Sequence, residues 1–245
     1  MQVHISPSWA SSASDDLDQR LLDAARRVVE AHPKIVLLLG PPGSGKTMLA
    51  RRIAQVLPPA SDPLVTCIWH GSGLSDETDP NSPPVPAVPF RAPHHTVSPA
   101  GLRGDRLRSL TALYPEAYLH EVERRRLWAD LKWPTNRPKP VMPGEVSLAH
   151  GGVLVLDETP EFTRAALDVV ASAWRQGSVC IPGQPEHTML PSKFYLVLAS
   201  NPCLCGYRGS ALRRCVCGPE PTGRYIGRVF SAFPEARDHI VEVLP

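Results

Sequence analysis

Apolar residues recur at helical spacing near the start of the chain and then give way to a continuous apolar run. Between Asp15 and Ala31, Leu, Val and Ala return every three to four residues, which predicts an amphipathic helix that ends before Pro33. The run from Ile35 to Leu39 is short, apolar and followed directly by a glycine-rich turn, as expected of a buried parallel strand. A second helix, MLARRIAQVL, comes after the turn.

The alternation of strands and helices continues along the chain. The segment GGVLVLDE at 151–158 and the segments 194–200 and 239–243 are predicted strands, and a helix is predicted over 163–176. This order favours an α/β fold with a parallel sheet covered by helices.

Three segments interrupt the alternation. We expect residues 1–14 to form a disordered tail. Residues 58–99 contain ten prolines and are predicted to be mostly loop, with one strand at Leu64–His70. The segment 102–141 is basic and is predicted to contain a helix from Glu116 to Leu131.

A phosphate-binding motif lies between the first strand and the second helix. The pattern GxxxxGK[ST] is formed by Gly40, Pro41, Pro42, Gly43, Ser44, Gly45, Lys46 and Thr47. Its glycines let backbone N–H groups curl around phosphate oxygens, and the helix N-terminus adds its dipole. We expect Lys46 to reach the β- and γ-phosphates of ATP and Thr47 to bind Mg²⁺. The alternative is a turn that only connects strand and helix.

Hydrolysis of ATP also needs a carboxylate beside the metal and a group that orients water. Asp157 follows an apolar strand and suits the Mg²⁺ side, and the adjacent Glu158 is a candidate general base. Asn201 ends another strand and could hydrogen-bond the water or the γ-phosphate. The alternatives are surface acids at a strand end and a turn-forming Asn before Pro202.

Two close pairs of cysteines suggest a metal site. The chain has six cysteines, of which four are candidate ligands of one tetrahedral, structural Zn²⁺: Cys203, Cys205, Cys215 and Cys217. Free thiols in a polar loop, or a redox pair, remain the alternative. Cys67 and Cys180 lie among apolar residues and are expected in the core.

Charge and hydropathy add little about partners. The net charge is only +2 and the pI is about 8.3, so affinity for nucleic acid would need a local basic patch. The longest apolar stretch is too short to cross a bilayer, and no secretory signal is visible. We therefore expect a cytoplasmic protein that makes no membrane contact.

Five sequence blocks resemble one family. The strings GPPGSGKTMLARRI, FRAPHHTVSPAGLRG, PGEVSLAHGGVLVLDETPEF, ASNPCLCGY and RRCVCGP are similar to the Mg-chelatase-type AAA+ ATPases (magnesium chelatase subunit ChlI-like), in particular to the ComM/YifB branch. The resemblance covers roughly residues 35–245. It implies a three-layer P-loop AAA+ domain with a central, mostly parallel sheet, assembly into a homo-oligomeric ring with ATP at subunit interfaces, and motor activity on DNA.

The resemblance also assigns roles by position. Lys46 and Thr47 match the Walker A motif, Asp157 and Glu158 the Walker B motif, and Asn201 the sensor-1 residue. Arg237, within FPEARDHIVEV, falls near the arginine that acts as a finger on the neighbouring subunit's nucleotide; the alternative is a plain surface arginine. His94 and His95 are expected to pack or hydrogen-bond in a loop and not to bind metal.

Departures from the family pattern bear on function. The family carries an N-terminal Lon-protease-like domain and a C-terminal lid, and we expect this chain to have neither; residues 15–245 would form the ATPase core with a Cys-rich loop at 202–218. About forty residues separate GLRG from PGEVSLAH, where the family has a short link. In the family, the segment between these two blocks faces the central channel of the ring.

Residues 102–140 contain nine Arg or Lys against five acids, with Tyr114, Tyr118, Trp128 and Trp133 among them. This segment could contact a nucleic-acid backbone or be a solvated helix. We expect an ATP-hydrolysing module that acts on DNA as an oligomer. A metal-insertion motor and a truncated ATP-binding remnant are the alternatives.

Overall fold

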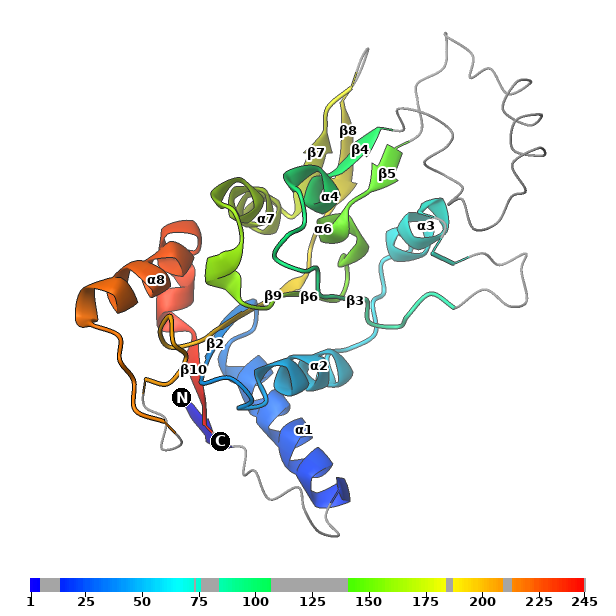
Figure 1. Ribbon diagram of the computed structural model, residues 1–245. Helices are drawn as coiled ribbons and strands as arrows, with labels where there is room; N and C mark the ends of the chain where they lie inside the picture. Colours follow the sequence, from blue (N-terminus) through cyan, green and yellow to red (C-terminus); the bar gives the residue numbers. More distant parts are fainter. Residues whose placement is uncertain are drawn as a thin grey trace, which may run out of the picture.

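A six-stranded parallel sheet forms the centre of the molecule (Figure 1). The computed structural model describes residues 1–4, 14–72, 74–75, 84–106, 141–183, 187–208 and 213–244. The strand order is β1-β10-β2-β9-β6-β3, and every neighbouring pair is parallel. The strands are β1 (Gln2–His4), β2 (Ile35–Leu39), β3 (Phe90–Arg91), β6 (Val153–Leu156), β9 (Tyr195–Ser200) and β10 (Ile240–Leu244). The prediction of a parallel α/β sheet is confirmed.

Helices cover both faces of this sheet, which gives three layers (Figure 1). Successive strand residues point to opposite faces, so Leu37 packs in one core cluster and Val36 and Leu38 in the other. The helices of the first layer are α1 (Ser14–Ala31) and α2 (Lys46–Val56). The opposite layer contains α4 (Pro99–Arg103), α6 (Glu145–Leu148), α7 (Arg164–Gln176) and α8 (Pro219–Ala232).

Two antiparallel hairpins lie outside the main sheet and next to one another (Figure 1). The first pairs β4 (Gly104–Arg106) with β5 (Val141–Pro143), and the second pairs β7 (Ser178–Ile181) with β8 (Thr188–Pro191). Arg106 Nη2 donates to Thr188 Oγ1 at 3.0 Å and so joins them. The helix predicted at Glu116–Leu131 and the aromatic residues beside it lie outside the described residues.

Two local predictions differ from the structure. Residues 2–4, which we expected in a frayed tail, form the edge strand β1, because their backbone pairs in parallel with β10. The segment predicted as a strand at Leu64–His70 is a helix, α3 (Leu64–Gly71). The Asp62 carboxylate accepts the Leu64 N–H at 3.0 Å, and Val65 and Ile68 bury one face at helical spacing. The hydrogen bond to Asp62 just before the helix and the burial of one face thus outweigh the strand preference of these β-branched residues.

The two cysteines outside the Cys-rich loop are exposed and do not belong to the core. Cys67 lies on α3 between the buried residues Val65 and Ile68 and points away from both. Cys180 occupies the outward face of β7.

Two short 3-10 turns, η3 (Thr159–Glu161) and η4 (Pro234–Asp238), follow β6 and α8. None of the helices in the described ranges is both long and apolar enough to span a membrane.

Candidate functional site

The loop of the GxxxxGKT motif connects β2 to α2, as the sequence predicts. Gly43 and Gly45 have φ angles of 76° and 89°, a left-handed conformation that strongly favours glycine. A Cβ atom on Gly40 would overlap the carbonyl oxygen of Val243 on β10, whereas one on Gly43 would meet nothing within 4 Å. The loop is therefore packed tightly on the sheet at its start and open at Gly43.

Lys46 begins α2 and folds its side chain back over the loop. Its Nζ donates to the carbonyl oxygens of Gly40 at 2.8 Å and Pro41 at 2.9 Å, and to Asn201 Oδ1 at 3.2 Å. Only 8% of the residue is exposed. Burial lowers the pKa of the ammonium group, and Asp157 and Glu158 act in the opposite direction. The ammonium group is thus held in place by two carbonyl oxygens of the loop and by the Asn201 side chain.

A hydroxyl and a carboxylate meet beside this lysine. Thr47 Oγ1 donates to Asp157 Oδ2 at 2.8 Å, and the Glu158 N–H donates to Asp157 Oδ1 at 3.0 Å. Both carboxylate oxygens of Asp157 therefore have partners. A hydroxyl beside a carboxylate is a donor set that suits Mg²⁺.

Glu158 adopts an unusual backbone conformation. Its φ and ψ angles are 51° and 46°, and it is the only non-glycine residue with a positive φ in the part of the chain that the structure describes. Such a conformation is disfavoured for a residue with a Cβ and is concentrated at functional positions. Here the turn buries Thr159 and Pro160 and leaves the Glu158 side chain exposed next to Asp157.

The order of the strands explains why these residues meet. Asn201 follows β9, which lies between β2 and β6 in the sheet. Because all three strands are parallel, their carboxyl ends share one edge, where open α/β sheets bind ligands. The structure therefore brings the P-loop, the Asp157–Glu158 pair and Asn201 together at that edge.

The sequence did not indicate that His95 and Tyr225 belong to this neighbourhood. His95 Nε2 lies 4.0 Å from Glu158 Oε2, and its ring meets the buried Phe162 ring edge-on with a 6.4 Å centroid separation. Tyr225 on α8 is buried; burial, with the charges of Glu161 and Glu158, raises its pKa to about 12. The APHHT block marked His95 only as a loop residue, and no pattern marked Tyr225, because both reach the site through tertiary packing.

Arg237 lies apart from this group. It belongs to η4, which precedes β10 and so lies at the opposite edge of the sheet from the P-loop. Its side chain is exposed, with Cζ 4.6 Å from the centroid of the Phe230 ring. Arg237 therefore does not join the nucleotide site of its own chain.

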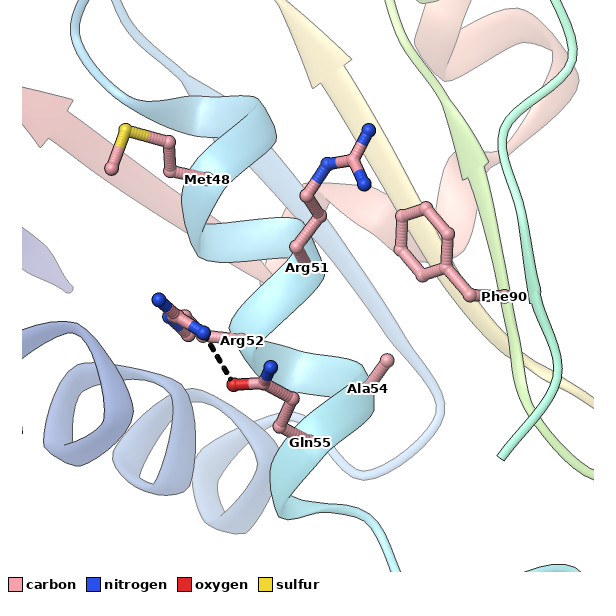
Figure 2. Close-up of a pocket in the computed structure, with 6 residues that line it drawn as sticks. All are labelled: Met48, Arg51, Arg52, Ala54, Gln55 and Phe90. Carbon is pink, nitrogen blue, oxygen red and sulfur yellow. Dashed lines mark hydrogen bonds between the residues drawn. The ribbon is translucent and has the colours of Figure 1, made fainter. Parts of the chain in front are cut away.

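A hollow beside α2 is lined by five residues of this helix and by Phe90 of β3 (Figure 2). Figure 2 shows Arg51 pointing towards Phe90 of β3, with its Cζ 5.6 Å from the ring centroid. Arg52 donates to Gln55 at 2.7 Å and also pairs with Asp18 of α1. Both guanidinium groups thus have partners, and the hollow adds no group to the nucleotide site.

The four cysteines of the Cys-rich loop converge as predicted. Their Sγ atoms all lie within 4.8 Å of one another, and Cys203 Sγ is 3.5 Å from Cys205 Sγ and 3.7 Å from Cys215 Sγ. Zn–S bonds of about 2.3 Å in a tetrahedron place sulfur atoms roughly 3.8 Å apart. The donor set therefore fits a closed four-thiolate zinc site.

The parallel sheet, its helical layers and the GxxxxGKT loop define a three-layer α/β protein of the P-loop class. A family model described as magnesium chelatase, subunit ChlI, matches residues 17–111 and 137–244. The chain belongs to this family.

Two curated relatives resemble almost the whole chain. YifB from Salmonella typhimurium is 31% identical over 97% of this chain, and the competence protein ComM from Haemophilus influenzae is 32% identical over 98%. The chain spans only 40% of the length of each.

Solved structures give weaker matches. A chain from the complex between subunits BchI and BchD of magnesium chelatase matches with a TM-score of 0.45 and 20% identity, over 91% of this chain and 57% of that one. NtrX from Brucella abortus in complex with ADP matches with a TM-score of 0.47 and 16% identity, over 96% and 36% of the two chains.

Proposed function

We propose that this chain is an ATP-hydrolysing AAA+ module that requires Mg²⁺ and acts on DNA as part of an oligomer. The observation that carries the ATPase proposal is the meeting of three strand ends: Thr47 contacts Asp157 at 2.8 Å, and Lys46 contacts Asn201 at 3.2 Å. Phosphoryl transfer depends mainly on positioning and electrostatic stabilisation, and these contacts supply fixed groups of both charges around the open face of Gly43.

Each residue has a distinct role in this proposal. Lys46 moves from its loop carbonyls to the β- and γ-phosphates, with the backbone N–H groups of residues 40–47 around them. Glu158 accepts a proton from the attacking water, and Asn201 orients that water or the γ-phosphate. His95, 4.0 Å from the Glu158 carboxylate, limits the direction in which that carboxylate points.

Thr47 and Asp157 would hold Mg²⁺ together with phosphate oxygens. The fit rests on the chemistry of the two side chains, since hydroxyl and carboxylate oxygens are preferred Mg²⁺ ligands. The ion would neutralise charge that develops on the phosphates.

We also propose that the four clustered cysteines hold a structural Zn²⁺. Four thiolates leave no open position for water, which argues against a catalytic metal. Clustered cysteines that bind metal are the usual pattern in reducing compartments, and we propose the cytoplasm as the location of this protein.

The proposals of a ring and of DNA as client rest on the family. One relative carries the name competence protein, and the resemblance to its branch implies a motor on DNA. We propose that Arg237, exposed at the far edge of the sheet, serves as a finger on the neighbouring subunit's nucleotide. The basic segment 102–141 is the proposed DNA contact.

Steady-state ATP hydrolysis with and without single-stranded and double-stranded DNA tests this function. Turnover that rises with DNA and disappears in Glu158→Gln is the expected result. Stimulation by magnesium chelatase partner subunits, and not by DNA, would support a metal-insertion motor. Tight ATP binding without turnover or assembly would show an ATP-binding module that does not work as a motor.

A further inference from the structure

The Cys-rich loop starts within the nucleotide site. Asn201, whose Oδ1 accepts from Lys46 at 3.2 Å, is separated from Cys203 only by Pro202. Cys203 is fully buried, and its Sγ lies within 3.7 Å of those of Cys205 and Cys215. A movement of Cys203 would therefore also move the backbone of Asn201, which lies only two residues earlier in the chain.

The same loop also packs against the P-loop. Gly206 has a φ angle of 82°, and a Cβ atom there would lie 2.7 Å from Pro42 Cδ and 2.8 Å from Pro42 Cγ. The Gly206 N–H donates to the Cys203 carbonyl at 2.9 Å. The turn that contains Cys203 and Cys205 thus packs its backbone directly against the ring of Pro42.

The loop has little apolar packing to hold this turn. Leu204 and Val216, the apolar neighbours of the thiols, are 62% and 86% exposed. A segment with few buried apolar contacts opens locally at low free energy, and a metal that binds only the ordered form stabilises it. Binding of a metal by the four thiols is thus the main interaction that can hold this turn against Pro42.

We propose that metal occupancy of the four-cysteine site sets the nucleotide affinity of the P-loop through two contacts, Gly206 on Pro42 and the Asn201–Cys203 segment. This inference rests on the nucleotide and zinc binding proposed above. With Zn²⁺ bound, Pro42 and Asn201 are fixed where Lys46 and the phosphates need them. Without the metal, the turn moves off Pro42 and the P-loop samples conformations that do not bind.

Thermodynamic linkage makes the proposal quantitative. If Zn²⁺ tightens nucleotide binding by some factor, nucleotide must tighten Zn²⁺ binding by the same factor. Couplings between sites commonly amount to roughly 5- to 150-fold, and we expect roughly tenfold here.

The test measures ADP affinity by titration calorimetry with the full chain, in its zinc-loaded form, after removal of zinc by a chelator, and after zinc is restored. We expect ADP affinity to fall roughly tenfold on removal and to recover on restoration. A zinc titration with a competing chromophoric chelator, with and without saturating ADP, should give the same factor.

Three variants separate the effect of bound zinc on ADP affinity from the effect of the contact between Gly206 and Pro42. Cys215→Ser should lose both zinc and ADP affinity, while Cys180→Ser, which changes an exposed cysteine outside the cluster, should lose neither. Gly206→Ala should retain zinc but bind ADP more weakly than the wild type, because the Cβ of the new alanine would push Pro42 away. Circular dichroism of each variant identifies any that fail to fold, and the reversible zinc removal does not depend on them.

The outcomes distinguish the two proposals. Equal ADP affinity with and without zinc, or a Gly206→Ala variant that binds ADP normally, would overturn the coupling and leave the nucleotide function intact. A zinc-loaded chain that binds no ADP at all would overturn the proposed function itself. Protein that does not take up zinc under reducing conditions would overturn the metal site and the coupling together.

Discussion

Replacement of Lys46 by Met separates the nucleotide-binding role of this lysine from its contribution to stability. Lys46 is 8% exposed and makes three hydrogen bonds without ligand. Methionine has a similar length, and it removes both the bonds and the cost of burying a charge. The exchange leaves the buried acceptors of Lys46 without this donor, which costs about 1–3 kcal/mol, and it relieves the cost of burying a charge. Because these two effects oppose one another, we expect the unfolding free energy to change by no more than about 1 kcal/mol.

The effect on nucleotide binding should be far larger. A hydrogen bond to a charged partner contributes about 1.5–3 kcal/mol, and Lys46 is proposed to contact two phosphates. Part of this gain is offset, because the ammonium group must first leave the Gly40 and Pro41 carbonyl oxygens. A net loss of about 3 kcal/mol weakens binding roughly a hundredfold.

Titration with a fluorescent ADP analogue and thermal unfolding measure the two effects. The matched control is Lys34→Met, since Lys34 is exposed at the opposite end of β2 and its loss should leave ADP affinity unchanged. The reasoning fails if Lys46→Met binds ADP within threefold of the wild-type affinity. It also fails if Tm falls by much more than about 4 °C, the shift that 1 kcal/mol produces in a domain of this size.

Further substitutions test the carboxylates and one ion pair. Glu158→Gln should lower ATP turnover roughly 10²- to 10⁴-fold with little change in ADP affinity, whereas Glu161→Gln, which changes a nearby exposed residue, should leave turnover unchanged; similar rates in both variants would contradict the role of Glu158. Asp157→Asn should abolish the difference in ADP affinity between Mg²⁺ and EDTA, and a retained difference would mean that the ion binds elsewhere. The Arg175 side chain hydrogen-bonds Glu235 and holds its pKa below the ordinary 4.5, so the pair stabilises the fold above about pH 4.5 and loses this contribution as pH falls through the lowered pKa. Glu235→Gln should therefore lower Tm at pH 7, because the loss of the ion pair reduces the unfolding free energy by about 1 kcal/mol or less. The difference in Tm between variant and wild type should shrink below pH 4. A difference that stays constant with pH would refute this.

Strong local signals made most of the central sheet predictable. The runs at 35–39 and 153–156 are apolar on both faces because helices cover both sides of the sheet. The short edge strands β1 and β3 were missed, because two or three residues carry no period. The helix α3 was predicted as a strand because its composition favours strand, whereas the hydrogen bond from the Leu64 N–H to Asp62 and the burial of one helical face favour helix.

The candidate site was predictable where a motif fixes both residue type and local structure. Walker-type motifs specify a loop between strand and helix, and the parallel sheet then brings Asp157 and Asn201 to the same edge. His95 and Tyr225 come from a loop and from a helix far along the chain. Their positions depend on packing between elements, which no single segment encodes.

The contacts of the ligand-free site indicate how binding and hydrolysis can be kept separate. Lys46 is satisfied by its own loop, and Thr47 by Asp157, so neither group is left unpaired without nucleotide. A phosphate chain must replace the bonds of Lys46, and it can do so because an ammonium group binds a charged phosphate oxygen more strongly than a neutral carbonyl oxygen. Glu158, by contrast, is exposed and held by its backbone turn at Asp157. Its position does not depend on Lys46, so a variant that loses nucleotide affinity at Lys46 should retain the geometry of the proposed base.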